Sequence, residues 1–202
     1  MLTGAGRAFS SGSALADPEE DGGAPAGPDP YDAFIERVES FPKPLVAAVN
    51  GLAVGIATTL LGHCDLVLAA RSARFRVPFA SLGLVPEAGS TVTLPALLGR
   101  QAAAHAFFTG AWISAETAAE RGLVWRLVDD EALLAATLAV CDEIAAMPVE
   151  ALVSAKRLLL AARLPAARAA RDREEPEFRR LLDGPAHRAA LRAFQDRRRE
   201  TA

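Results

Sequence analysis

Two short apolar runs, Leu45–Val49 and Cys64–Ala70, constrain the fold of this chain more than any other feature of its sequence. Neither run alternates with polar residues, a pattern typical of parallel strands that are buried on both faces. Between them, Asn50-Gly51 turns the chain, and the small residues of 55–62 favour a buried helix. A strand, a helix and a second strand in this order predict an α/β fold with parallel strands.

The remaining segments are mainly helical in pattern. The stretch Asp17–Pro30 is acidic and rich in Pro and Gly, and it predicts no regular element. We expect a core over residues 1–130 and a helical region over 131–202. Further extended pieces are predicted at 1–3, 73–75 and 123–128, and helices at 31–40, 91–98, 101–109, 114–121, 131–146, 148–162 and 171–199.

Composition excludes several classes of function. A chain of 202 residues that is 51% hydrophobic can bury one sizeable core, and a net charge of −3 gives no basic field for nucleic acid. No apolar run reaches the roughly 18 residues of a membrane span, and the start lacks a signal peptide. Cys64 and Cys141 have no metal-ligand spacing. We therefore expect a cytoplasmic protein with reduced cysteines, no metal, and no nucleic-acid or membrane partner.

Three glycine-containing segments, 9–13, 50–57 and 82–90, are candidates for chemistry. Gly12 allows close approach to the backbone, and the N–H of Ser13 after it can point outward. In the second segment, a turn leads into a helix whose first N–H groups suit an anion or an oxyanion. In the third, Glu87 is a lone carboxylate among apolar residues, where burial raises a carboxyl pKa. From the residues alone, two packing turns and a Glu at the start of a helix are the favoured interpretation.

Other polar residues offer weaker candidates. His63 and His105 have no obvious catalytic partner, which indicates core or surface histidines. Asp65 stands at the head of a strand, where we expect it to cap a turn. No nucleophile-elbow motif supports a Ser-His-Asp arrangement.

Four blocks in a fixed order resemble the crotonase family, the enoyl-CoA hydratase and isomerase superfamily. The blocks read LTGAGRAFSSG, KPLVAAVNGLAVG, CDLVLAARSARFRVPFASLGLVPEAGS and LLGRQAAAHAFFTGAWISAETAAERGLV. The resemblance implies a spiral of ββα units with a helical C-terminal region that drives assembly into a homotrimer or hexamer. It implies an acyl-CoA thioester as substrate, with no separate cofactor, and an oxyanion hole made by the backbone N–H groups of Ser13 and Ile56.

The resemblance also narrows the reaction. The two glutamates of hydratases fall here on Thr59 and Phe79, neither of which is a carboxylate. Glu87 instead occupies the position of the single base in a branch similar to the Δ3,Δ2-enoyl-CoA isomerases. This implies that Glu87 shifts the double bond of a 3-enoyl-CoA to the 2-position, with Phe79 excluding water. The implied substrate pocket is formed by Gly12, Gly55, Thr59, Phe79 and Pro86.

Alternatives remain open at this point. A related branch of the family has Asp at the position of Glu87 and isomerises ring-epoxide thioesters. Two further alternatives are a residual hydratase and a truncated, non-catalytic protein of the same fold. Two departures from the family bear on them. Ala14 replaces a typical Asp, and family members have several strands and a helix before the position of Met1. We therefore expect an N-terminally short core.

Overall fold

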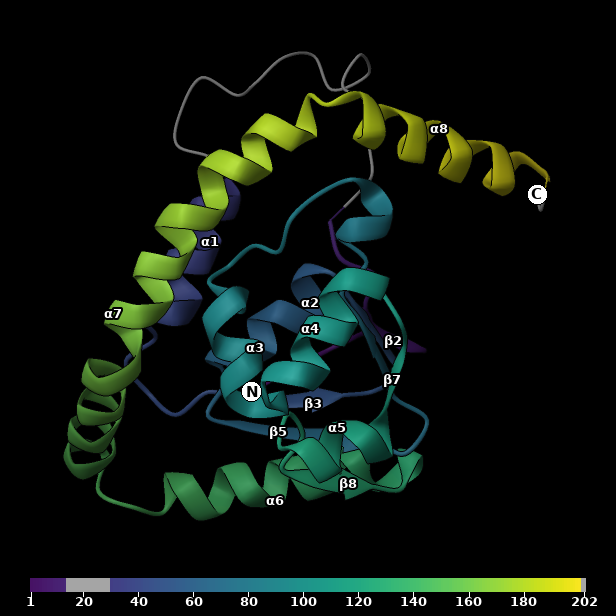
Figure 1. Cartoon of the computed structure of the whole chain (residues 1–202). Coiled ribbons are helices and arrows are strands. Elements are labelled where there is room, and N and C mark those ends of the chain that lie inside the picture. The colour runs from purple at the N-terminus through teal and green to yellow at the C-terminus, as the bar shows by residue number, and fades with distance from the viewer. Residues whose placement is uncertain (14–29, 201–202) are drawn as a thin grey trace.

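The computed structural model describes residues 1–13 and 30–200 (Figure 1). The strands form two four-stranded sheets, of order β1-β3-β5-β8 and β2-β4-β6-β7. Their bounds are β1 Leu2–Thr3, β2 Ala8–Ser10, β3 Val46–Val49, β4 Leu52–Val54, β5 Leu66–Ala70, β6 Arg74–Arg76, β7 Ile113–Ser114 and β8 Arg126–Val128.

Successive strands alternate between the two sheets. Each of the pairs β1–β2, β3–β4 and β5–β6 sends one strand to each sheet before the chain enters a helix, so the chain winds as a spiral of ββα turns. Strand pairing is parallel except between β6 and β7. The predicted α/β fold with parallel strands is confirmed, and so is the spiral that the resemblance implied.

The sequence predicts the longer strands β3 and β5 but not the shorter strands β2, β4 and β7. β3 and β5 are the two apolar runs, and they pair over four residues from Val46 opposite Leu66 to Val49 opposite Ala69. In contrast, β2, β4 and β7 have only two or three residues each, too few to show a period, and the sequence did not predict them. They form most of the second sheet.

The helices follow the predicted order, with two differences. The predicted helix over 55–62 is α2 for one turn and then tightens into a 3-10 helix, η1. The helices are α1 Pro30–Glu39, α2 Ile56–Thr59, α3 Ser90–Leu98, α4 Arg100–Thr109, α5 Ala115–Arg121, α6 Leu133–Ala145, α7 Val149–Leu182 and α8 Pro185–Glu200, with 3-10 turns η1 Leu60–His63, η2 Ala80–Leu82 and η3 Asp130–Ala132.

The second difference is α7. The separate helices predicted at 148–162 and 171–199 are wrong, because one helix runs through Pro165 and Pro176 and the break comes at Gly184. A proline removes one intrahelical hydrogen bond and normally kinks or ends a helix. Here Arg163 and Arg168, on either side of Pro165, both form ion pairs with the core, and these hold the helix on its path.

The core lies between the two sheets and the helices around them, with Leu61, Leu68, Phe75 and Leu94 fully buried. The helix α6 contacts β3 and β5, and α7 runs beside α3 before α8 crosses η2 (Figure 1). Within the part of the chain that the structure describes, no single helix is long and apolar enough to cross a bilayer. One pair, 130–145 with 149–182, meets that length and composition together but is bent by 104°.

Candidate active site

Glu87 lies in the loop between η2 and α3, and it is 7% exposed. The Thr59 hydroxyl donates a hydrogen bond of 2.6 Å to Glu87 Oε1. The other oxygen, Oε2, is buried and has no hydrogen-bond partner among the described residues. One carboxylate oxygen is therefore held in place, while the second keeps its lone pairs for a proton.

Burial and, as the smaller cause, the negative charge of Glu174 together raise the pKa of Glu87 from 4.5 to about 8. Both effects oppose ionisation of Glu87. Burial removes the water that would solvate the carboxylate, and the negative charge of Glu174 repels it. A carboxyl group that titrates near neutral pH can both accept and return a proton during turnover, which is the property of an effective general base.

The turn that carries Glu87 has an unusual backbone. Ala88 has φ +59°, the one left-handed non-glycine residue in the described chain, and Gly89 follows with φ +70°. An alanine in this region is held there by its surroundings, since the conformation costs about 1–2 kcal/mol. The ring nitrogen Nε2 of buried His63 lies 2.7 Å from the Ala88 carbonyl oxygen. Burial lowers the His63 pKa, which favours the neutral ring, and Nε2–H donates this bond because a carbonyl oxygen can only accept.

The second part of the site is made of main chain. Gly12 has φ +90°, and a Cβ there would lie 2.7 Å from the Val54 carbonyl oxygen, so the 12–13 segment lies directly on the end of β4. Gly55, with φ +60°, then turns the chain into α2. Ile56 is the first residue of that helix, where an N–H has no intrahelical acceptor.

The helix α2 joins the two parts. Ile56 stands at its start and Thr59, one turn later, contacts Glu87. Gly12 reaches the same junction through Val54, with the exposed Ser13 beside it. The structure thus brings the segments of Gly12, Gly55, Thr59 and Glu87 together, although they lie far apart in the sequence.

The other two predicted pocket residues, Pro86 and Phe79, contribute less directly to the site. Pro86 adjoins Glu87 in the chain and is half-buried. Phe79 is buried in the core cluster, and its carbonyl oxygen accepts the Leu84 N–H at 2.8 Å, which closes the start of the loop. Phe79 therefore contributes to the loop's shape through the backbone.

Two site residues were missed in the sequence. His63 was read as a histidine without a partner, and its acceptor is a carbonyl, which leaves no signal in a sequence. Glu174 lies 87 positions after Glu87 on α7, yet its carboxylate accepts the Gly89 N–H at 2.7 Å and the Thr91 N–H at 2.8 Å. Only the path of α7 could have revealed this contact.

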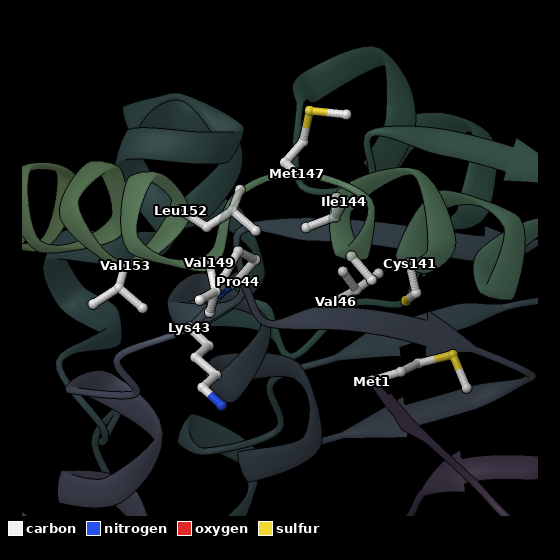
Figure 2. A pocket seen from close by; sticks show the side chains of 11 residues that line it. Met1, Lys43, Pro44, Val46, Cys141, Ile144, Met147, Val149, Leu152 and Val153 are labelled. Carbon is white, nitrogen blue, oxygen red and sulfur yellow. The ribbon is translucent and has the colours of Figure 1, made fainter.

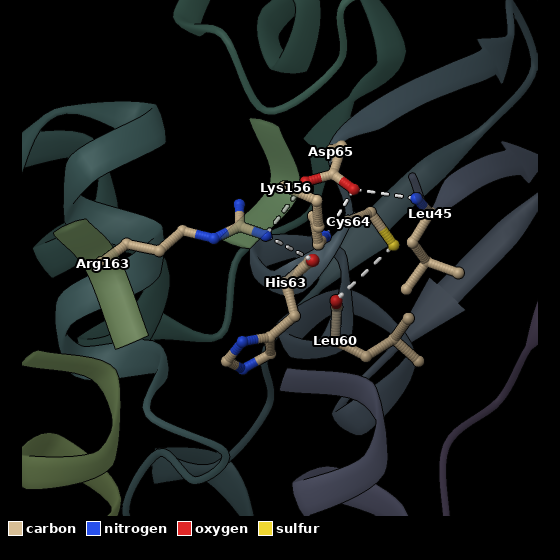
Figure 3. Close-up of polar contacts among 7 residues, drawn as sticks. All are labelled: Leu45, Leu60, His63, Cys64, Asp65, Lys156 and Arg163. Atoms are coloured by element: carbon tan, nitrogen blue, oxygen red, sulfur yellow. Dashed lines mark hydrogen bonds and ion pairs between the residues drawn. The ribbon is translucent and has the colours of Figure 1, made fainter. Parts of the chain in front are cut away.

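Asp65 has a different role from the expected turn cap. Its carboxylate accepts the Leu45 N–H at 2.8 Å and pairs with Lys156 at 2.5 Å and Arg163 at 3.1 Å (Figure 3). Arg163 also donates to the His63 carbonyl oxygen at 3.1 Å. Both cations belong to α7, so Asp65 fastens this helix to the segment between η1 and β5.

Two surface hollows lie apart from Glu87. The first, of about 320 Å³, lies at the edge of the first sheet against α6 and the start of α7 (Figure 2). The second, of about 420 Å³, lies beside α4 and α5. Neither is lined by Glu87, Thr59 or Gly12.

The whole described chain matches the model of one protein family. Residues 1–201 match enoyl-CoA hydratase/isomerase. The chain belongs to the enoyl-CoA hydratase/isomerase family. A solved enoyl-CoA hydratase/isomerase from Pseudoalteromonas atlantica T6c has a TM-score of 0.90 at 32% identity, over 95% of this chain and 76% of that one. The crotonase resemblance seen in the four sequence blocks is therefore confirmed.

Two curated relatives of the family are equally similar in sequence. The 1,2-epoxyphenylacetyl-CoA isomerase of Escherichia coli K12 is 43% identical over 142 residues, which are 66% of this chain and 53% of that protein. Enoyl-CoA delta isomerase 2 of Rattus norvegicus is also 43% identical, over 61% of this chain and 33% of that protein. The matched region thus spans about half or less of these relatives' length.

Proposed function

We propose that this protein is an enoyl-CoA isomerase that moves the double bond of a 3-enoyl-CoA to the 2-position. The observation that carries the proposal is Glu87, a buried carboxylate with one oxygen held by Thr59 and a pKa of about 8. Thr59 and Phe79 stand where two-glutamate hydratases need carboxylates, so a single proton carrier is left. The rat delta isomerase at 43% identity supports the same chemistry.

In the proposed reaction the thioester oxygen accepts the N–H groups of Ser13 and Ile56. Glu87 takes a proton from C2, and the electrons of that C–H bond pass into a dienolate whose negative charge rests on the thioester oxygen. Losing one oxyanion-hole donor typically costs about 2.7–4 kcal/mol of transition-state stabilisation. The dienolate then takes the same proton from Glu87 at C4, which leaves the double bond between C2 and C3.

The Glu87 side chain is 7% exposed, so little of it is open to solvent. Exclusion of water suits a dienolate, because electrostatic stabilisation by fixed donors is stronger in a dry site.

The test is turnover of a 3-enoyl-CoA, followed by the absorbance of the conjugated 2-enoyl thioester. Glu87→Gln should lower kcat by about 10²–10⁴-fold, the usual contribution of a positioned acid–base group. Glu143→Gln, an exposed change on α6, is the matched control and should keep the wild-type rate. Equal rates for Glu87→Gln and the wild type would rule out the proposed role of Glu87.

A second candidate is isomerisation of a ring-epoxide thioester, favoured by the Escherichia coli relative at 43% identity. The related branch has Asp at the position of Glu87, so the carboxylate of this chain extends one methylene further than in that branch. The same wild-type preparation, offered a ring-1,2-epoxyphenylacetyl-CoA in place of the 3-enoyl-CoA, separates the two. A higher kcat/KM for the epoxide would transfer the assignment to it.

We further propose that the chain assembles as a homotrimer or hexamer through its helical region. Leu158 is 69% exposed on α7, and Leu159 beside it is also exposed, which is unusual for adjacent leucines. A stable interface has to bury about 1,000 Å² or more. Light scattering on the wild type and on Leu158→Glu would test this, with a monomeric wild type as the contrary result.

A further inference from the structure

Glu174 connects the long helix α7 to the turn that carries Glu87. Its carboxylate is buried and accepts three hydrogen bonds: one from the Gly89 N–H at 2.7 Å, one from the Thr91 N–H at 2.8 Å, and one from the Thr91 hydroxyl at 2.5 Å. These backbone N–H groups belong to the first turn of α3 and the residue before it, which have no acceptors within their own helix.

The same stretch of α7 also contacts the turn by packing. A Cβ added to Gly89 would lie 2.7 Å from the Ala167 carbonyl oxygen, so the backbones of the turn and of α7 are in close contact. Two turns of helix separate Ala167 from Glu174, and both reach the same short segment. The turn therefore has α7 along one side, while His63 holds the Ala88 carbonyl and Thr59 holds the Glu87 side chain.

The helix α7 is itself fixed to the core. Lys156 and Arg163 pair with Asp65, and Arg168 and Arg171 lie 3.0 and 3.5 Å from the buried Glu39 carboxylate. Glu174 lies one turn beyond the last of these anchors. A side chain on such a helix has a defined position, so its three hydrogen bonds can define the position of the turn.

We propose that Glu174 is a positioning residue for Glu87: its carboxylate accepts the Gly89 and Thr91 N–H groups and so fixes the 87–89 turn. This rests on the proposed function of Glu87 as the proton carrier. Glu174 does not itself contact the reacting atoms in this scheme. It acts through the backbone of Gly89 and Thr91, and through its charge.

The charged groups around the turn support the electrostatic part. After burial, the negative charge of Glu174 is the second cause that raises the Glu87 pKa. Arg168 and Arg171 on the same helix pair with Glu39 of α1, Arg163 pairs with Asp65, and burial favours the neutral form of His63. Removing the Glu174 charge should therefore lower the Glu87 pKa, while burial keeps it above its ordinary value.

The experiment is a carboxyl ¹³C NMR titration of the full chain, labelled at glutamate, with the Glu87 signal assigned by its absence in Glu87→Gln. The wild-type midpoint should lie at about 8. Glu174→Gln, which keeps the volume and removes the charge, should lower that midpoint. Glu175→Gln, the adjacent residue paired with Arg179, is the matched control and should leave it unchanged.

The second variant, Glu174→Asp, keeps the charge and withdraws the carboxylate by one methylene. It should keep the wild-type midpoint but lower kcat with 3-enoyl-CoA by about 10–100-fold at unchanged KM, because small displacements of a catalytic group have effects of this size. It also provides the test if Glu174→Gln does not fold.

An unchanged Glu87 midpoint in folded Glu174→Gln would overturn the electrostatic part of the proposal, and a wild-type kcat in Glu174→Asp would overturn the positioning part. The titration needs no turnover, so the two proposals can fail separately. If the Glu87 midpoint falls in Glu174→Gln while the wild type fails to turn over 3-enoyl-CoA, that pair of results would support the coupling of Glu174 to Glu87 and refute the isomerase assignment.

Discussion

The two halves of the site are built from different parts of the chain. The half around Gly12 and Ile56 is main chain, positioned by glycines whose φ angles side chains rarely adopt. The half around Glu87 depends on side chains that come from three other segments: Thr59 of α2, His63 of η1 and Glu174 of α7. The first half should therefore tolerate changes of side chain except at glycine, while the second should lose function one contact at a time.

Outside Glu87 itself, the largest effect should come from adding a side chain in the main-chain half. Gly12→Ala places a Cβ 2.7 Å from the Val54 carbonyl oxygen at φ +90°, so the segment bearing the Ser13 N–H has to move. We expect kcat to fall by about 10²–10³-fold, as for the loss of one oxyanion donor. Ile56→Val changes only a side chain and should stay within about twofold. Equal losses in the two variants, measured by 3-enoyl-CoA turnover, would contradict the contrast.

The carboxylate half should show a stability effect that depends on pH. Because the folded-state pKa of Glu87 is raised from 4.5 to about 8, the folded protein binds more protons than the unfolded chain between these values, and stability falls as pH rises through them. Glu87→Gln does not titrate, so it should be more stable than the wild type by about 2–4 kcal/mol at pH 8.

Below pH 4.5 the two proteins should converge, since both states of the wild type then carry a protonated Glu87. Urea unfolding at pH 4.5, 6 and 8 measures the difference. A difference that stays constant across this range would show that Glu87 is not held in an environment that disfavours its charge.

A smaller effect should follow from Thr59→Val, which keeps the shape of the side chain and removes its hydroxyl. The variant leaves Glu87 Oε1 without its 2.6 Å donor, and a hydrogen bond of this kind contributes about 0.5–1.5 kcal/mol. We expect kcat/KM to fall by up to about tenfold. A wild-type kcat/KM would mean that Glu87 is oriented by its turn alone.

This contrast also explains what the sequence could predict. The strands β3 and β5 were readable because their apolar runs follow from burial on both faces, and Gly12 and Gly55 were readable because glycine itself marks unusual backbone. Glu87 stood out as a carboxylate among apolar residues. Its hydrogen-bond donor Thr59 became a candidate only through the family resemblance.

The rest depended on long-range packing. His63 and Glu174 bind backbone carbonyl and N–H groups, which are common to nearly all residues. The residue types at Ala88 and Gly89 therefore do not indicate these contacts. The continuous path of α7 through Pro165 was hidden because local rules predict a break there. That path depends on Arg163 and Arg168 pairing with Asp65 and Glu39, which lie 98 and 129 positions away.

The central claim is that one carboxylate carries one proton from C2 to C4. Turnover of a 3-enoyl-CoA with two deuterium atoms at C2, in ordinary water, tests it directly. Glu87 is 7% exposed, so the deuteron it takes should be returned before it exchanges with solvent. The account predicts a 2-enoyl product with one deuterium at C2 and one at C4 by mass spectrometry and NMR. A product with only solvent hydrogen at C4 would contradict it.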